Sequence, residues 1–561
     1  MPQQDVFHLR HSQEEPPRLG RKRAAGGRRC PFFPQGLGVL VLGLLVATGA
    51  RAAPVCERPH VPAEAGPRAL PEAMARELDR WVRAELGREA HAGLAVGVVR
   101  GDERWVGTWG QRDVARGLPV TPRTTWRMAS VTKSFTAVAV LQLVEQGRLS
   151  LDAPVHTLVP TWTDKRWPVT VRQLLGHLGG VTHYGRFGPS HDTGPLDTAG
   201  AVALVTGYPL EAEPDTRFLY STWAYNLLGA IIESVSGQSY GAYLQEHVFA
   251  PAGMAHAALD DRSTRDEHHA AGYRVRDGRL VASKVVDVSG RFAGGGTRAS
   301  IEDLLGFGQA LLDYQLVSRD STGRMQRSMW TRDGRLTDYG MGFATWPLRG
   351  HYVVAHAGAQ PETSTLLLLL PGERVALALA SNVEGQGPLL RRIAYGLIAR
   401  LREGGGPRLE AAVRDPVDAV VNEGLQHVFG YGLAYHQWAW HGPGTLPDEG
   451  GLPEAFAEVA RLLDRSTIAR SPAEARERIL AGHEPRGHWR LTRVGAHMAR
   501  TLEESLGAER LRDYPTRGPL AFFNDYLALC EARACPDPYR FDEALRAELR
   551  RLTPPGKAAG R

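Results

Sequence analysis

Cysteine is scarce in this chain, with four Cys among 561 residues. A dense disulfide framework is therefore excluded, and no Cys-x-x-Cys motif or Cys/His cluster indicates a metal site, so we expect no metal. We expect no cofactor either. Low-complexity tracts are also missing, and 43% of the residues are hydrophobic, which excludes the disordered and collagen-like classes. The length is that of a globular protein with room for two to four domains.

An excess of one charge sign is missing too, once the N-terminal segment is set aside. The formal net charge is +6, but residues 1–53 account for +5 of it through eight basic and three acidic residues. The remaining chain is thus close to electrically balanced. A phosphate-binding groove needs a clustered basic surface, so we do not expect a nucleic-acid partner.

Long hydrophobic runs are absent except near the N-terminus. A basic stretch precedes residues 36–50, which carry no charge, and Ala50 and Ala52 flank Arg51. This pattern is typical of a secretory leader over residues 1–53 and predicts cleavage near Ala52 or Ala53, hence a periplasmic or extracellular protein. The run is shorter than the ~20 residues of a membrane-spanning helix. An uncleaved anchor is the alternative, and only then would the membrane be a partner.

Strand-like segments lie at both ends of a helix-like middle, which predicts one sheet assembled from distant parts of the chain. A helix is expected within residues 70–90, with Gly87 as its stop signal. Further helices are expected at 130–146, 223–237 and 389–401. Strands are expected at 94–99, 104–109, 340–346, 352–355, 364–370 and 375–381.

Ser130 and Lys133 are the first residues that indicate chemistry. If Ser130 opens the helix of residues 130–146, it shares a face with Lys133, beside the free N–H groups of the helix N-terminus. A hydroxyl needs a base to become a nucleophile, and lysine can be that base only if burial or a nearby cation lowers its pKa. Four lysines follow the leader, and only Lys133 has Ser three positions before it. Spacing alone leaves open a helix cap followed by a solvated lysine.

Further motifs occur along the chain in a fixed order. They are residues 126–137, 141–152, 170–177, 218–222 with Tyr225, 293–296, 339–343 and 356–358. On these motifs, residues 70–400 resemble the β-lactamase-related serine hydrolases, which include class C β-lactamases, D-alanyl-D-alanine peptidases and esterases. The resemblance implies an α+β fold of α/β/α type over residues 54–402, with an antiparallel sheet flanked by helices plus an all-helical subdomain.

The resemblance also implies roles for single residues. Ser130 would be the acylated nucleophile and Lys133 its proton acceptor, with Tyr220 as part of the same proton-transfer unit. The backbone N–H groups of Ser130 and Ala359 would form the oxyanion hole, where one donor typically contributes ~10²–10³ in rate. Without the resemblance, Tyr220 would be interpreted as a core tyrosine.

Departures from the family pattern bear on the substrate. Thr222 stands where the family has the Asn of Tyr-x-Asn, while His356 and Ala357 replace the Lys and Thr of Lys-Thr-Gly. Thr222 and Gly358 are the expected substrate-binding residues. The lost cation and hydroxyl disfavour a substrate with a free carboxylate. At an ordinary pKa of ~6.5, catalytic His356 would be neutral at pH 7, which predicts activity that rises between pH 5 and 8.

Two other departures from the family pattern are interpreted without a catalytic role. His177 begins a His-Leu-Gly-Gly segment where His-Thr-Ser-Gly is usual, and it is expected to be a structural hydrogen-bonding residue. Glu362 follows Pro361 where Pro-Gly is common. It is expected to be a solvated surface acid, the alternative being an acid at the cleft rim that favours cationic or neutral substrates.

Residues 408–561 lie outside the resemblance, after a Gly-rich linker at 403–407. Amphipathic runs predict a mostly helical domain of unknown role. Cys530 and Cys535 are close enough in sequence to form a disulfide, which would leave Cys56 unpaired. The runs are residues 452–463, 473–480, 489–506 and 541–552.

Two histidine-containing segments of this region could suggest further sites. The aromatic cluster at residues 435–441 is interpreted as core packing rather than a sugar or metal site. His483 and His488 resemble part of a zinc-peptidase motif. They lie five positions apart with Pro485 and Gly487 between them, so they cannot share a helical face as zinc ligands do.

These observations predict an exported serine hydrolase that cleaves an ester or amide (peptide) bond of a small molecule through a Ser130 acyl-enzyme. We expect an esterase or a D-amino-acid or cell-wall type peptidase, with weak or no β-lactamase activity. A catalytically weak binding or sensor protein of the same fold is the second hypothesis, because the family's Asn and Lys are lost. A zinc peptidase in the C-terminal region is the third hypothesis, and it would require bound zinc.

Overall fold

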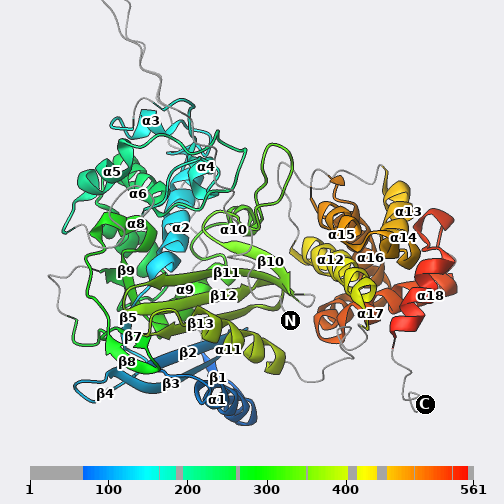
Figure 1. Ribbon diagram of the computed structural model, residues 1–561, viewed down its shortest axis with the longest axis horizontal. Helices are drawn as coiled ribbons and strands as arrows, with labels where there is room; N and C mark the ends of the chain where they lie inside the picture. Colours follow the sequence, from blue (N-terminus) through cyan, green and yellow to red (C-terminus); the bar gives the residue numbers. More distant parts are fainter. Residues whose placement is uncertain are drawn as a thin grey trace, which may run out of the picture. The chain divides into compact units, whose positions relative to one another are not determined.

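The computed structural model describes residues 67–162, 165–184, 194–260, 266–348, 351–401, 414–438, 451–484, 487–533 and 535–553. The leader, Cys56 and the expected linker lie outside these residues. Within them, eight strands form a central mixed sheet in the order β1-β3-β2-β13-β12-β11-β10, with β4 paired to β3 (Figure 1). The strands are β1 (Arg68–Ala69), β2 (Gly93–Arg100), β3 (Glu103–Asp113), β4 (Leu118–Pro119), β10 (Ala344–Leu348), β11 (His351–Gln360), β12 (Thr363–Leu370) and β13 (Val375–Ser381).

The sheet joins the two ends of the domain, as the sequence predicts. β2 pairs antiparallel with β13, and all the other pairs are antiparallel except the short β1, which runs parallel to β3. One expected strand is shorter than predicted: residues 340–343 are not extended, because Gly342 has φ 82° and the strand starts only at Ala344. The mixed sheet therefore confirms the expected α+β class.

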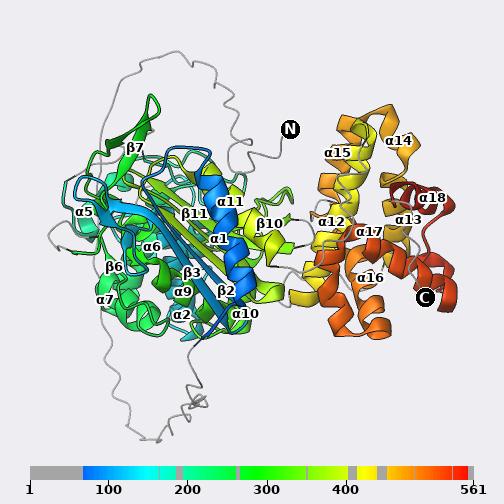
Figure 2. The same cartoon turned by 90° about the horizontal axis from the view of Figure 1, so that it is seen from below.

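Each face of the sheet carries helices. Along β12, Leu366 and Leu368 join one hydrophobic core, whereas Leu367 and Leu369 join the other, as the two-residue period of a strand requires. On the first face, α1 (Glu72–Leu86) and α11 (Gly387–Arg400) lie side by side (Figure 2). α9 (Ile301–Leu312) covers the second face.

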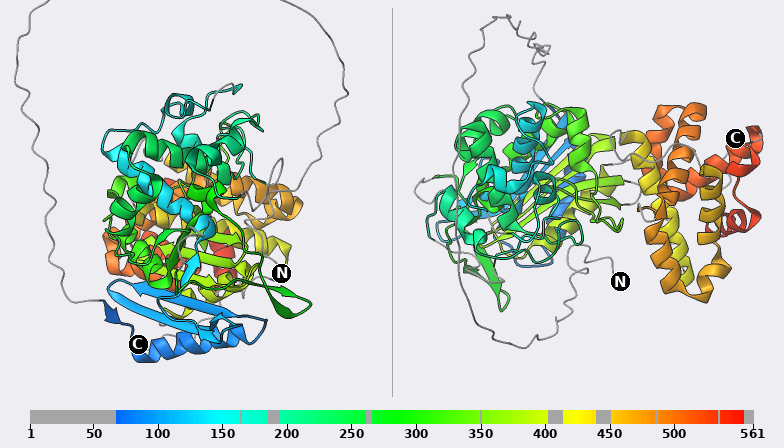
Figure 3. Two further views of the ribbon diagram at one scale, coloured as in Figure 1. Left: turned by 90° about the vertical axis from the view of Figure 1, so that its left-hand side faces the viewer. Right: turned by 90° about the horizontal axis from the view of Figure 1, so that it is seen from above.

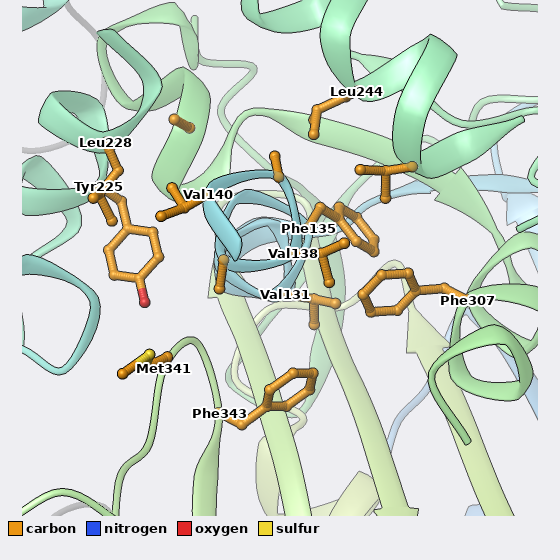
Figure 4. Close-up of a cluster of buried hydrophobic side chains, with 14 of the residues drawn as sticks. Val131, Phe135, Val138, Val140, Tyr225, Leu228, Leu244, Phe307, Met341 and Phe343 are labelled. Carbon is orange, nitrogen blue, oxygen red and sulfur yellow. The ribbon is translucent and has the colours of Figure 1, made fainter. Parts of the chain in front are cut away.

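Helix α2 (Thr132–Glu145) lies within the second core. Apolar side chains from several elements surround it (Figure 4), and Phe135 packs edge-on against Phe249 and Phe307 at 5.4 and 4.6 Å between ring centroids. A helix that is apolar on all sides is typical of a buried helix. This packing fixes the end of α2 at which Ser130 lies.

A group of helices and two small sheets completes this part of the chain. α6 begins after Ser221, whose hydroxyl caps it by accepting a hydrogen bond from the Ala224 N–H at 3.0 Å. The helices are α3 (Val155–Leu158), α4 (Val171–Leu175), α5 (Thr198–Thr206), α6 (Thr222–Ser236), α7 (Tyr240–Leu244), α8 (Phe292–Gly295) and α10 (Arg319–Gln326). The strands are β5 (Thr125–Arg127), β6 (Ala258–Leu259) and β9 (Thr297–Ser300) in one sheet, and β7 (Tyr273–Arg276) and β8 (Arg279–Ala282) in another.

The described residues after 413 are mostly helical, as predicted. Figure 3 draws these residues in yellow to red, and most of them are coiled ribbons. α16 packs against α12, α13 and α17 around a hydrophobic core, and Cys530 is disulfide-bonded to Cys535. No helix in the described ranges has the length and apolar character needed to span a bilayer. The helices are α12 (Pro416–Trp438), α13 (Leu452–Leu462), α14 (Arg465–Arg470), α15 (Pro472–Ala481), α16 (Arg490–Leu506), α17 (Ala508–Arg533) and α18 (Glu543–Leu552).

Candidate active site

Ser130 lies in a short 3₁₀ turn, η1 (Ala129–Val131), between β5 and α2. The residue before it, Ala129, has φ 47°, a region that residues other than glycine seldom occupy. Two hydrogen bonds hold the backbone just upstream: Met128 N–H donates to the Thr297 carbonyl at 2.8 Å, and the Thr365 hydroxyl donates to the Met128 carbonyl at 2.9 Å. The nucleophile candidate thus stands on a strained but well-supported turn.

Lys133 lies next to Ser130, as their spacing predicts. Its Nζ is 3.2 Å from Ser130 Oγ, 3.1 Å from Thr222 Oγ1 and 2.6 Å from the Gly294 carbonyl oxygen. Position 294 needs glycine, because a Cβ there would lie 2.6 Å from Thr222 Cγ2. Thr222 therefore retains a contact with the amine, although the family's amide is lost.

The environment of Lys133 changes its protonation. The side chain is completely buried, and burial lowers its pKa well below 10.5; the positive charge of Arg291 lowers the pKa further. The amine is therefore neutral at a lower pH than an ordinary lysine. Lysine can act as a base only if burial or a nearby cation lowers its pKa, and both do so for Lys133.

Tyr220 completes the group around Ser130. Its ring centroid lies 4.8 Å from Lys133 Nζ, and interaction of its hydroxyl with the Ser130 side chain lowers the pKa of Tyr220, an effect smaller than that of burial. Burial raises the pKa of the Tyr220 phenol above its usual value of 10. The phenol is thus protonated at neutral pH, so it can relay a proton but not act as a phenolate base.

Two histidines orient the segment that carries Tyr220 and Thr222. His177 Nδ1 accepts a hydrogen bond from the Ser221 N–H, and His183 Nδ1 accepts one from the Thr222 N–H, each at 3.1 Å. The His177 ring packs 4.4 Å from the Tyr220 ring, and burial lowers its pKa well below 6.5. The hydrogen bond agrees with the structural role expected for His177; the sequence gives no role to His183.

His356 lies on β11 with both ring nitrogens engaged. Nδ1 is 2.8 Å from the Ala357 carbonyl oxygen, so it carries the proton, and Nε2 accepts a hydrogen bond from the Tyr339 hydroxyl at 3.0 Å. Burial, with a smaller effect of the Lys133 charge, lowers the pKa of His356 to about 3. The expected rise of activity through His356 titration between pH 5 and 8 is therefore corrected, because this ring is neutral throughout that range.

Tyr339 is a site residue to which the sequence assigns no role. It belongs to the motif at residues 339–343, and that membership is the only signal that pointed to it. Burial, with a smaller effect of the neighbouring Tyr225, raises the pKa of the Tyr339 phenol well above 10. Tyr339 therefore fixes His356 as a neutral group.

The backbone of β11 passes directly against η1. A Cβ at Gly358 would lie 2.1 Å from Thr365 Oγ1 and 2.4 Å from the Met128 carbonyl oxygen, so only glycine permits this approach. Ala359 follows and is exposed. The two backbone groups expected to form the oxyanion hole, at Ser130 and Ala359, thus belong to segments that touch, and their role remains a prediction.

The interpretation of Glu362 as a solvated surface acid is wrong. Glu362 is 8% exposed, and its Oε2 lies 2.6 Å from Nη1 of Arg127, which is 4% exposed. The sequence could not show this pairing, because the two residues lie in segments far apart in the chain.

The other histidine motifs form no metal site in the described part of the chain. His483 is buried with its ring 4.4 Å from that of Tyr431, and His488 has φ 55°, outside any helix. His436 Nε2 lies 2.6 Å from a Glu503 carboxylate oxygen. No group of three His, Cys, Asp or Glu among the described residues could hold a metal ion. Trp440 and His441 lie outside those residues.

Comparison with known proteins gives a match over the same region. The family model described as Beta-lactamase matches residues 78–400. The serine beta-lactamase-like protein LACTB, mitochondrial, of Mus musculus is 27% identical over 435 residues, which is 59% of this chain and 78% of that protein. The putative penicillin-binding protein PbpX of Bacillus subtilis is 28% identical over 281 residues, covering 50% of this chain and 68% of that protein.

A solved structure shares the fold. The octameric penicillin-binding protein homologue from Pyrococcus abyssi is 28% identical, with a TM-score of 0.52, over 58% of this chain and 77% of that one. The region matched by the family model contains every residue that lies around Ser130.

Proposed function

Since this chain belongs to the Beta-lactamase family of serine hydrolases, we propose that it is an exported serine hydrolase that cleaves an ester or amide bond through an acyl-enzyme on Ser130. Lys133 would take the hydroxyl proton, and Tyr220 would relay it. The proposal rests above all on one observation, the set of three oxygens around the buried Lys133 amine.

The geometry around Lys133 Nζ suits a neutral amine. Two of its neighbours, the Gly294 carbonyl and Thr222 Oγ1, can accept its two N–H groups. The nitrogen lone pair then remains for Ser130 Oγ at 3.2 Å. An amine held in this way accepts the hydroxyl proton as the oxygen attacks.

The reaction then has two halves. In the first, Ser130 Oγ bonds to the substrate carbonyl carbon, its proton passes to Lys133, and the N–H groups of Ser130 and Ala359 stabilise the oxyanion. The bond to the alcohol or amine breaks as the Tyr220 phenol gives that group a proton and regains one from Lys133. In the second half, a water oxygen bonds to the carbonyl carbon of the acyl-enzyme while Lys133 and Tyr220 take one water proton. The bond between that carbon and Ser130 Oγ then breaks, the proton passes to Ser130 Oγ, and the carboxylic acid departs.

The surroundings favour a substrate without a free carboxylate near the reacting carbonyl. His356 is neutral, with a pKa of about 3, and Ala357 has no hydroxyl. Neither can attract a carboxylate as the family's Lys and Thr do. We therefore propose an esterase or a D-amino-acid or cell-wall type peptidase with weak or no β-lactamase activity.

Export is proposed from the leader pattern of residues 1–53. A curated relative, LACTB, is named as mitochondrial, so the compartment is tested by N-terminal sequencing of the protein recovered from each cell fraction. A mature N-terminus near residue 53 outside the cytoplasm supports export.

A chromogenic short-chain ester tests the activity. The enzyme should release many equivalents of chromophore per protein, and Ser130→Ala should abolish this release. A burst of one equivalent without turnover would instead support the catalytically weak binding or sensor protein, an alternative favoured by the replacements at Thr222 and His356. No release and no burst would reject Ser130 as a nucleophile.

A further inference from the structure

The turn between β11 and β12 has an unusual residue at a glycine position. Gln360 pairs with Thr363, which leaves Pro361 and Glu362 as a two-residue turn. Glu362 has φ 77°. A type II turn, with proline first, requires positive φ at this second position and favours glycine there. A glutamate at this position is strained, and such strain persists only where surrounding contacts hold it.

The protein makes room for this glutamate. A Cβ on Gly272 would lie 2.2 Å from the Glu362 Cβ, so any other residue at 272 would displace it. The Glu362 carboxylate is buried against Arg127, with 2.6 Å between Oε2 and Nη1. The strained turn at Glu362 and the absence of a side chain at Gly272 thus both allow the carboxylate of Glu362 to reach its buried position.

Neutralising Arg127 does not require Glu362. Arg127 Nε also lies 2.7 Å from Asp260 Oδ2, and its Nη2 donates to the Val286 carbonyl at 2.9 Å. The two carboxylate contacts are close but not aligned as hydrogen bonds, so they act as charge pairs. One guanidinium therefore faces two carboxylates, and Asp260 alone would balance its charge. The contact between Glu362 and Arg127 is thus additional to the charge balance that Asp260 already provides.

Arg127 and Glu362 belong to the two segments that carry the proposed oxyanion hole. Arg127 lies three residues before Ser130, and Glu362 lies three residues after Ala359. The Thr363 hydroxyl ties the same two segments by donating to the Arg127 carbonyl at 3.0 Å. Between Arg127 and Ser130 lies Ala129, whose φ of 47° must be held from outside.

We propose, on the basis of the function proposed above, that Glu362 is a positioning residue. Its charge pair with Arg127 fixes the segment of Ser130 against the segment of Ala359, so that both N–H groups point at one developing oxyanion. A small misplacement of a reacting or stabilising group is enough to lower the rate many-fold. Glu362 is thus kept at a glycine position because catalysis needs it there.

The test separates catalysis from folding. Glu362→Gly restores the residue that the turn favours and leaves Arg127 paired with Asp260, so the melting temperature should stay equal or rise. The value of kcat for a chromogenic ester should fall about tenfold with KM unchanged. Affinity for a boronic acid, which forms a tetrahedral adduct on Ser130, should fall by a similar factor. Glu362→Gln, which keeps the side-chain size without the charge, should change kcat in the same direction.

Asp277→Gly is the matched control. Asp277 is an exposed acid with φ 50° in the β7–β8 turn, and it contributes no group to the site. Its replacement removes a strained acid in the same way and should leave kcat and boronate affinity unchanged.

Wild-type kcat and boronate affinity in both Glu362 variants would overturn the proposal. A kcat loss that occurs only with a matching fall in melting temperature would also overturn it, since the role would then be structural. Failure of the proposed function looks different: wild-type protein would then neither hydrolyse the ester nor bind the boronate.

Discussion

Lys133 is the residue whose environment changes its chemistry most. Burial and the charge of Arg291 both lower its pKa well below 10.5. In the folded state it therefore releases its proton at a pH where an unfolded lysine still holds one. The free energy of unfolding therefore rises with pH between the lowered pKa of Lys133 in the folded state and the ordinary lysine pKa of 10.5. On the acidic side, activity should increase with pH as this amine loses its proton.

Replacing Lys133 tests its role as the base. Lys133→Met keeps an unbranched side chain of similar length but removes the amine. The value of kcat for ester hydrolysis should fall by ~10²–10⁴, the range typical of a lost general base. Steady-state kinetics gives the value, and thermal melting checks that the variant is folded. A loss smaller than tenfold in a folded variant would remove Lys133 from the proton-transfer step.

His356 allows a test of stability against pH. Its pKa is about 3 in the folded protein and ~6.5 unfolded, so between these values the unfolded state binds more protons. The free energy of unfolding should therefore fall as pH falls from 6.5, and His356 alone should account for about 2 kcal/mol between pH 7 and pH 4.5. Urea unfolding of wild type and His356→Gln at both pH values measures this. Equal losses in the two proteins would show that His356 is not held neutral.

The site residues that the sequence predicted share a local signal. Ser130 and Lys133 are three positions apart on one turn, so their contact follows from helix geometry, and Tyr220 follows from an ordered motif. Arg291 and Glu362 act through space, from segments whose approach depends on the packed fold. Their charges reach the site only after folding, so no spacing rule could indicate them.

At the scale of elements, the contact between β11 and η1 brings the nucleophile to the sheet. A Cβ at Gly358 would overlap Thr365 Oγ1 and the Met128 carbonyl oxygen. Gly358→Ala should therefore separate the two segments, with loss of about 2 kcal/mol of stability and most of the esterase activity.

Gly323 provides the control for that substitution. It lies in α10 without positive φ, and apart from its chain neighbours and its own helix backbone no atom comes within 4 Å of the place that the methyl group of an alanine would take. Gly323→Ala should raise stability by ~0.5–1 kcal/mol and leave activity unchanged. Calorimetry and ester kinetics on both variants measure these effects, and a Gly358→Ala enzyme with full activity would contradict the account of the contact.

The strands and helices of the sheet domain were predictable because the spacing of their apolar residues shows whether one face or every face of an element is buried. The boundary near residue 340 was missed because Gly342 adopts φ 82°, a conformation that composition does not reveal. Likewise, β11 continues past residue 355, its expected end, to Gln360 because it pairs with β12 along that length.

At the scale of the whole molecule, the helices after residue 413 have a hydrophobic core of their own, distinct from the two cores of the sheet. The disulfide between Cys530 and Cys535 closes a short loop within it. Replacing both Cys by Ser should lower the stability of this region by about 2 kcal/mol and leave ester hydrolysis unchanged. Denaturant unfolding with and without reductant measures the first effect. A large loss of activity would show that this region supports the site.

Covalent labelling shows whether Ser130 is a nucleophile that Lys133 activates. Wild type and Lys133→Met should be treated with a fluorophosphonate, digested and mapped by mass spectrometry. A single adduct on Ser130 that forms rapidly in wild type and at least about a hundredfold more slowly in the variant is the predicted result. Labelling at another residue would show that Ser130 is not the nucleophile, and equal rates in both proteins would show that Lys133 does not activate it.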